Sequence, residues 1–201
     1  NASFGLSGRT GNTERFAVLA SMRATLQGPD DRLVFYGSYD NSEDDGVTTT
    51  DELKGGADYS RLISKQWGWY ARTELESDEG ENLDLRATAA GGATYLWKDT
   101  ENWNLEFRGG LAYRYESYFD GTLNELPSLD LALINAYTFT GVGIMRNVVT
   151  YNPAFEDFGN FRVFHESTFE MPLGSGDKWK LRIGFSNDYN SRPTSGLEKM
   201  D

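Results

Sequence analysis

The sequence of 201 residues is long enough for one domain and for one large β-barrel. Its net charge of −12 argues against a nucleic-acid partner, whose phosphates it would repel, and the absence of cysteine excludes disulfides and thiolate metal sites. The mean hydropathy is −0.57 and no run approaches 18 apolar residues, which excludes a transmembrane helix but not a transmembrane barrel, whose strands are apolar on one face only.

Hydrophobic alternation with a period of two recurs from one end of the chain to the other and predicts an all-β protein. No linker or low-complexity segment divides the chain, so we expect a single barrel domain over residues 1–201. The pattern favours an up-and-down antiparallel barrel. The expected strands, in chain order, are 2–9, 14–27, 31–41, 49–64, 67–77, 82–98, 102–117, 127–139, 143–152, 160–173 and 178–190.

Eleven strands are an awkward number, because bacterial single-chain barrels usually have an even count. The segment after Tyr189 resembles a loop that leads into one more strand, and the chain stops at Asp201. We therefore expect a barrel of about twelve strands whose last strand is missing from this chain, which would leave an open edge beside the first strand.

Alternation alone does not say which face points outward. In a membrane barrel the apolar face contacts lipid, whereas in a soluble barrel the two faces are reversed. All the tryptophans lie beside alternate connections, on the apolar phase, so an up-and-down barrel would place them near one rim. This position is typical of an interfacial aromatic girdle. The candidate girdle residues are Trp67, Trp69, Trp97, Trp103 and Trp179.

The lengths of the expected connections also differ between the two ends. Those at the tryptophan end are short, at 28–30, 64–66, 99–102 and 174–177. Those at the other end are mostly longer and acidic, at 41–48, 117–126 and 154–159. Short periplasmic turns and longer external loops are the outer-membrane pattern.

The opposite phase of the strands carries charges of both signs and fits a lumen lined by ion pairs. On a soluble barrel the same phase would be an ordinary solvated face. The candidate lumen network consists of Arg72, Glu74, Asp84, Arg86, Glu106, Arg108, Arg114, Glu116, Lys180 and Arg182. The same phase continues with Lys54, Asp58, Glu76, Arg162, Glu166 and Glu170.

Three regions resemble the YdiY-like family of salt-induced outer-membrane proteins, which carries domain of unknown function 481. They are the segment Gly5–Glu14, the tyrosine- and glycine-rich middle strands, and the segment Asn187–Pro193 followed by Gly196, Lys199 and Asp201. The sequence departs from the family pattern at Asp201, where family members continue through a last strand that ends in an aromatic residue. The resemblance implies an outer-membrane barrel and supplies no catalytic residue.

The sequence contains few residues that indicate catalytic or binding chemistry. His165, the only histidine, shares a strand face with Ser167, and a nucleophilic serine needs a base within hydrogen-bond reach. No third group that could orient the base is indicated, so a structural role for His165 is preferred. Gly91-Gly92 and Gly109-Gly110 lie within adjacent strands, where close backbone packing or a bend explains them better than a phosphate loop. We expect no catalytic, cofactor or metal site.

The sequence therefore predicts a non-enzymatic barrel in the bacterial outer membrane, acting as a narrow pore or as a structural or anchoring component of the envelope. Its expected partners are outer-membrane lipid and, through acidic outer loops or the open edge, other envelope proteins, and not nucleic acid. Two alternatives stay open. One is a soluble periplasmic barrel that binds a ligand, and the more remote one is a lipid-modifying barrel enzyme that uses His165.

Overall fold

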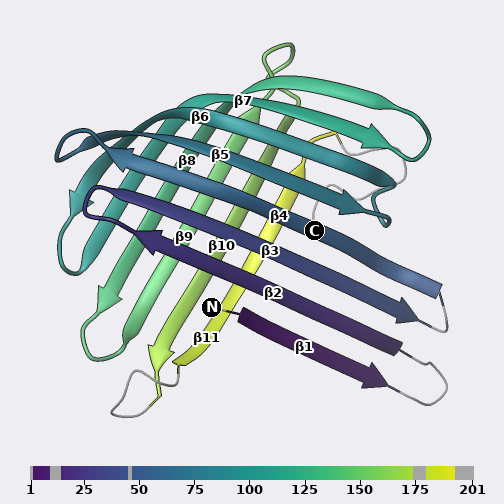
Figure 1. The fold of residues 1–201 in the computed structure, drawn as a ribbon, viewed down its shortest axis with the longest axis horizontal. Helices are drawn as coiled ribbons and strands as arrows, with labels where there is room; N and C mark the ends of the chain where they lie inside the picture. Colours follow the sequence, from purple (N-terminus) through teal and green to yellow (C-terminus); the bar gives the residue numbers. More distant parts are fainter. Residues whose placement is uncertain (1, 10–14, 45–46, 174–179, 193–201) are drawn as a thin grey trace. The chain divides into compact units, whose positions relative to one another are not determined.

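The computed structural model describes residues 2–9, 15–44, 47–173 and 180–192. They form an eleven-stranded antiparallel sheet whose strands follow one another in sequence order (Figure 1). No helix of these residues is long and apolar enough to cross a membrane. The strands are β1 (Ala2–Arg9), β2 (Arg15–Gln27), β3 (Asp31–Asp44), β4 (Val47–Leu62), β5 (Trp67–Asp78), β6 (Leu83–Asp99), β7 (Trp103–Tyr118), β8 (Leu123–Phe139), β9 (Gly143–Pro153), β10 (Phe161–Pro172) and β11 (Lys180–Asn190).

The expected all-β class, the antiparallel up-and-down order and each expected strand are confirmed. Strand boundaries agree to within a few residues, the usual error of a sequence-based boundary. Two of the expected loops differ from the structure. Residues 41–44 continue β3 and β8 begins at Leu123, so much of the two expected acidic loops, 41–48 and 117–126, is strand.

The connection between β7 and β8 is a tight turn of residues 119–122 instead of a long loop. Gly121 has a φ of 84°, a conformation that glycine adopts without strain. The backbone N–H of Thr122 donates to Oδ1 of Asp120 at 2.8 Å, and this hydrogen bond lowers the pKa of the Asp120 carboxyl. The turn chemistry explains how the hairpin closes with so few residues.

Two compact units divide the chain. The first takes in β1 to β3, β4 up to Arg61, and the segments Tyr70–Ala90 and Tyr113–Leu126. Its hairpins are in simple register, from Ala2↔Met22 in β1–β2 and Gln27↔Arg32 in β2–β3, with one irregularity between Ser42 and Glu43 in β3–β4.

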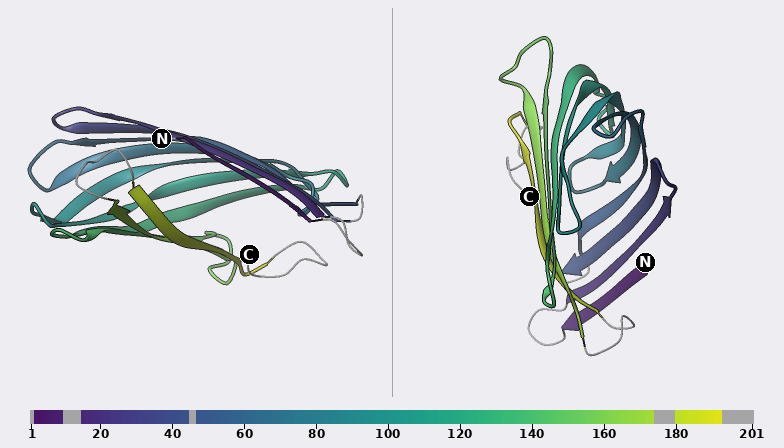
Figure 2. Two further views of the ribbon diagram at one scale, coloured as in Figure 1. Left: turned by 90° about the horizontal axis from the view of Figure 1, so that it is seen from below. Right: turned by 90° about the vertical axis from the view of Figure 1, so that its left-hand side faces the viewer.

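The second unit takes in Leu62–Trp69, Gly91–Ala112 and the chain from Pro127 onward. Its strands β9, β10 and β11 run side by side in each view (Figures 1 and 2, green to yellow). Phe161 pairs with Pro153 between β9 and β10, and Pro172 pairs with Lys180 between β10 and β11.

The two faces of the strands differ sharply in chemistry and in exposure. We call the phase that carries the ionisable side chains the charged face and the opposite phase the apolar face. On β7, Leu111 and Tyr113 of the apolar face are 63% and 45% exposed, whereas Arg108 and Glu116 of the charged face are buried. The usual rule for soluble proteins, apolar inside and charged outside, is therefore reversed along this strand.

The paired glycines of β6 and β7 pack backbone against backbone. A Cβ atom on Gly92 would lie 2.3 Å from the carbonyl oxygen of Gly109 and 2.4 Å from Cα of Gly110, and one on Gly110 would lie 2.3 Å from the oxygen of Gly91. Only residues without a side chain permit this approach. The expectation of close backbone packing is confirmed.

Candidate functional site

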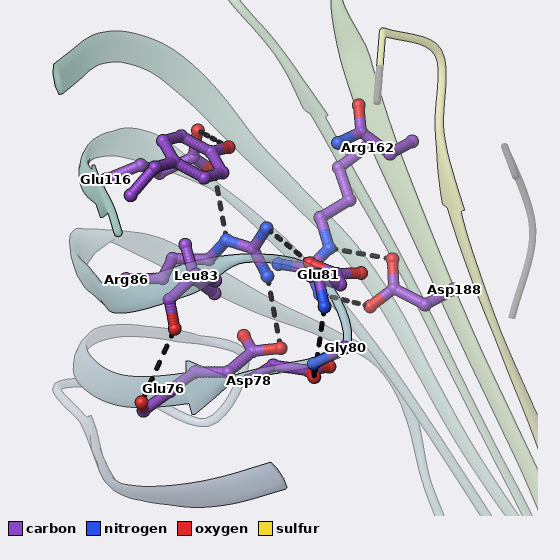
Figure 3. A network of polar contacts seen from close by, with 12 residues as sticks. Glu76, Asp78, Gly80, Glu81, Leu83, Arg86, Glu116, Arg162 and Asp188 are labelled. Carbon is purple, nitrogen blue, oxygen red and sulfur yellow. Dashed lines mark hydrogen bonds and ion pairs between the residues drawn. The ribbon is translucent and has the colours of Figure 1, made fainter. Parts of the chain in front are cut away.

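Arg86 is the centre of a buried cluster of charges on the charged face of the first unit. Its Nε lies 2.9 Å from Oε1 of Glu116, its Nη1 lies 3.0 Å from Oε1 of Glu76, and its Nη2 lies 3.0 Å from Oε2 of Glu81 (Figure 3). The side chain is 3% exposed. A planar guanidinium with its fork of donors is suited to binding several carboxylates at once.

The alternation of the strands brings these partners together. Glu76 belongs to β5, Arg86 to β6 and Glu116 to β7, and all three are on the charged phase of neighbouring strands. Glu81 comes from the turn between β5 and β6. One arginine thus joins three adjacent strands and one turn.

Further side chains extend the cluster to both sides. Nε of Arg114 lies 3.2 Å from Oε1 of Glu116, and the hydroxyl of Tyr118 donates to Oε2 of the same carboxylate at 3.0 Å. On the other side, Nζ of Lys54 lies 3.5 Å from Oε1 of Glu74 and 3.7 Å from Oε2 of Glu76.

Tyr36 completes this edge of the cluster. Its hydroxyl donates to Oε2 of Glu74 at 2.5 Å, and its ring covers Gly56, where an added Cβ would lie 2.6 Å from the ring. A glycine covered by an aromatic ring of the next strand is a recurrent way to protect the exposed backbone of a sheet. The tyrosine therefore ties β3, β4 and β5 together at the level of the charged cluster.

The turn of residues 79–82 is held in a defined position. Oδ1 of Asp78 accepts hydrogen bonds from the backbone N–H groups of Gly80 and Glu81, at 2.8 and 3.2 Å. Asn82 has a φ of 57°, which asparagine tolerates better than most residues. This local structure turns the Glu81 carboxylate back toward Arg86 (Figure 3).

The second unit carries ion pairs of its own. Oε1 of Glu106 lies 2.7 Å from Nε of Arg108, two residues along β7, and accepts a hydrogen bond of 2.7 Å from the hydroxyl of Thr94 on β6. Between β10 and β11, three pairs form a ladder across the two strands. They are Arg162–Asp188 at 2.5 Å, Glu166–Arg182 at 3.2 Å and Glu170–Lys180 at 2.9 Å.

Most of the candidate network residues thus form ion pairs, but not in one continuous set. Arg86, Arg114, Glu116 and Glu74 meet in the first unit, and Glu106 with Arg108 form a separate pair in the second. Arg72 is half-buried, close enough to Tyr36 to act on it electrostatically. Asp84 is exposed at the start of β6, directly after the buried Leu83.

The described tryptophans gather at the turns of the second unit. Trp67, Trp69, Trp97 and Trp103 are between 37% and 58% exposed on the apolar face. Backbone hydrogen bonds connect these turns to their neighbours, from Leu96 to Gln66 at 2.7 Å and from Thr138 to Asn102 at 2.8 Å. Trp179, the remaining candidate, falls outside the described residues.

Trp67, Trp97 and Trp103 contact side chains of neighbouring strands. The rings of Trp67 and Tyr95 are 4.7 Å apart, and those of Trp97 and Phe107 are 5.5 Å apart. Nε1 of Trp103 donates to Oδ1 of Asn135 at 2.8 Å. The polar edge of Trp103 therefore has a partner while its ring stays exposed, as an amphipathic interfacial side chain requires.

Ser167 and His165, which could have supported hydrolysis, each contact a different residue. The hydroxyl of Ser167 donates to Oδ1 of Asn147 on β9 at 2.6 Å, and His165 packs edge-to-face against Phe185 with ring centres 5.3 Å apart. A general base must accept the proton of its nucleophile, and here that proton is directed to an amide oxygen. Among the described residues, no group of His, Cys, Asp and Glu is placed to hold a metal ion.

Sequence reasoning missed Glu81, Tyr36 and Asp188 as members of the polar clusters. Asp188 continues the charged phase of Lys180 and Arg182, so the alternation could have identified it. Nothing in the sequence indicates that the side chain of Glu81, in a polar turn, would contact Arg86 on the following strand. Its role depends on the conformation of the turn.

Comparison with known proteins matches one family model, described as "Protein of unknown function, DUF481", over residues 2–201. A search of the curated proteins found no match. Among solved structures, the crystal structure of the Pseudomonas putida toluene transporter TodX is similar, with a TM-score of 0.37 and 10% identity, over 94% of this chain and 72% of that chain.

Proposed function

Since this chain belongs to the DUF481 family, which is described only as of unknown function, we propose its role from its own chemistry: it is a β-barrel of the bacterial outer membrane that forms a narrow pore. Bacterial single-chain barrels usually have an even number of strands, so the proposal includes a barrel of about twelve. The barrel is non-enzymatic, and its main partner is outer-membrane lipid.

One observation carries the proposal. Large apolar side chains are exposed on one phase of the strands, among them Met22 at 66%, Leu53 at 60%, Leu75 at 57% and Leu111 at 63%, while Arg86, Arg108 and Glu116 on the other phase are buried. In water such a surface would cost free energy in proportion to its apolar area. Against hydrocarbon it is favourable, and the charged phase then faces the lumen.

The same orientation, with the apolar face toward lipid and the charged face toward the lumen, also accounts for the tryptophan rim and for a narrow pore. Trp67, Trp69, Trp97 and Trp103 lie at one end of their strands, where a membrane barrel has its interfacial girdle. The lumen is narrow because the side chains of Lys54, Arg86 and Arg114 lie along the charged face, where they pair with carboxylates of the same or a neighbouring strand and fill part of the space. Ion pairs of this kind limit conduction to small solutes and ions.

Two experiments test the proposal in sequence. The purified protein should need detergent to remain monodisperse, whereas the alternative soluble barrel would stay monodisperse without it. Reconstituted in planar bilayers, the protein should then give small ohmic current steps. Detergent dependence without current would leave a structural or anchoring barrel, and the pore would have to be abandoned.

A further inference from the structure

We propose that two copies of this chain pair in the membrane through the apolar face of β8 to β11, where polar side chains interrupt the apolar surface. The inference rests on the proposed membrane barrel and adds a protein partner to it. It concerns residues of the second unit only. We call these side chains the polar row, which consists of Asn135, Asn147, Ser167, His165 and Asn187.

The register of the strands makes the polar row continuous. Asn135 of β8 pairs with Asn147 of β9, and Asn147 pairs in turn with Ser167 of β10. His165 follows next to Ser167 on the same face of β10 and pairs with Asn187 of β11. The row therefore crosses the neighbouring strands β8 to β11 without a gap.

Large apolar side chains border the polar row on the same face. Ile183 and Phe185 of β11 are 61% and 58% exposed, and Leu133 of β8 and Met145 of β9 are exposed as well. In the proposed orientation this face meets hydrocarbon, where polar side chains are costly. A row of them in that setting needs a partner with polar groups, which lipid tails do not provide.

Hydrogen bonds within the chain use only part of what the two asparagines of β8 and β9 offer. Oδ1 of Asn135 accepts from Nε1 of Trp103 at 2.8 Å, and Oδ1 of Asn147 accepts from the hydroxyl of Ser167 at 2.6 Å. An asparagine amide also carries two N–H donors. Within the described part of the chain these donors of Asn135 and Asn147 have no acceptor, so they are available to a partner.

The other end of the polar row is still less satisfied. The ring of His165 packs edge-to-face against Phe185, with ring centres 5.3 Å apart. Neither the imidazole of His165 nor the amide of Asn187 forms a hydrogen bond with any residue that the structure describes. Polar groups left unbonded in hydrocarbon are unfavourable, so these two side chains favour a covered face over one that contacts lipid alone.

A second copy of the chain is the partner that fits this face. Amide, hydroxyl and imidazole groups can donate and accept, so the polar row is complementary to itself. A twofold axis along the membrane normal places the same residues of both copies at the same depth. Lipid headgroups lie at the ends of the strands, whereas Asn147 and Ser167 lie near the middle of β9 and β10. Between membrane segments, hydrogen bonds and close packing hold the contact, because lipid tails are as apolar as the side chains.

The double variant His165→Phe with Asn187→Leu tests the polar row with little effect on the single copy. Phenylalanine keeps the ring contact with Phe185, and no hydrogen bond to a described residue is lost. The chain has no cysteine, so dyes can be attached at an introduced Glu156→Cys in the exposed loop after β9. Energy transfer between labelled copies in lipid vesicles should show a dimer that the double variant weakens by about tenfold. Leu75→Ala, on the apolar face of β5, is the matched control and should leave the dimer unchanged.

Cysteine cross-linking locates the contact. Met145→Cys and Val149→Cys lie beside Asn147 on the same face of β9, one on each side of the polar row. With a short bismaleimide in vesicles, at least one of them should give a covalent dimer. Leu75→Cys is 57% exposed on the apolar face of the first unit and should stay monomeric.

The outcomes separate this interface from the proposed barrel. A chain that requires detergent, conducts in bilayers and is monomeric at every lipid dilution would refute the interface and leave the pore standing. Equally tight dimers of the native chain and the double variant, or cross-linking of Leu75→Cys alone, would place the contact elsewhere and also refute it. A chain that is monodisperse without detergent would refute the membrane barrel, and the interface with it.

Discussion

Arg86 is the central residue of the charged face in the first unit, because it binds carboxylates from β5, from the following turn and from β7. Removing charges from water is costly, and their mutual attraction repays this only when each charge has partners in good geometry. Here Nε of Arg86 donates to Glu116 at 2.9 Å and Nη2 donates to Glu81 at 3.0 Å, and Oε1 of Glu76 lies 3.0 Å from Nη1. The cluster is therefore sensitive to loss of its cation.

Arg86→Gln should destabilise the protein strongly, since it leaves Glu76 and Glu116 buried without their main partner. Breaking a buried ion pair by removing one member costs about 3–5 kcal/mol. The control is Arg182→Gln, whose pair with Glu166 is largely exposed and should be worth less than about 1 kcal/mol. Urea unfolding in detergent micelles, followed by tryptophan fluorescence, measures both. Equal losses for the two variants would mean that the Arg86 cluster is not buried as described.

At the scale of single residues, the sequence identified most charged partners and few of the contacts. Arg86 and Glu116 were predicted on the same face because strict alternation places them there, and they do meet. Asp84 is exposed at the start of β6, and its place in the network stays a prediction. Glu81 could not be predicted, because its position depends on the Asp78 hydrogen bonds and on the positive φ of Asn82.

At the scale of strands, alternation proved sufficient to locate every element but not to find where strands end. Residues 41–44 and 123–126 are polar or mixed, which is typical of loops, yet they continue β3 and β8. A strand that extends beyond an apolar layer has no reason to keep an apolar phase. Its sequence therefore resembles a loop although its backbone stays paired.

The contact between β6 and β7 allows a test of backbone packing. Gly110→Ala should destabilise the protein by about 1–3 kcal/mol, because the new Cβ would lie 2.3 Å from the Gly91 carbonyl oxygen and neither backbone can yield easily. Gly109→Ala, one position away, meets only a Leu131 methyl group at 3.9 Å and should change stability by less than about 0.5 kcal/mol. The shift in the urea midpoint measures the stability of both variants. A larger loss of stability in Gly109→Ala than in Gly110→Ala would contradict this packing.

The tryptophan rim can be located in the membrane directly. With the other tryptophans replaced by phenylalanine, the fluorescence of Trp103 should be quenched best by lipids brominated close to the headgroup. The reason is that Nε1 of Trp103 is hydrogen-bonded to Asn135, while its ring is exposed on the face that we propose to meet lipid. Strongest quenching by bromines near the acyl-chain terminus would place the rim inside the hydrocarbon and remove the girdle.

At the scale of the whole molecule, the proposed function requires that the apolar face meets lipid. Composition and alternation are compatible with a soluble barrel, since period two is the same whichever face is outward. The burial of Arg86, Arg108 and Glu116 beside exposed Leu75 and Leu111 favours the membrane. The family model covers residues 2–201 and leaves the activity open. The proposed function therefore rests on the burial of the charged face and the exposure of the apolar face.

A nitroxide scan of residues 71–76 on β5, in the protein reconstituted into lipid bilayers, tests this claim most directly. We expect spin labels at Ala71, Thr73 and Leu75 to collide mainly with oxygen dissolved in the bilayer. Labels at Arg72, Glu74 and Glu76 should instead be reached by a water-soluble nickel complex or by neither reagent. The reverse alternation, or equal access of the nickel complex to both phases, would contradict a membrane barrel with its charged face inward.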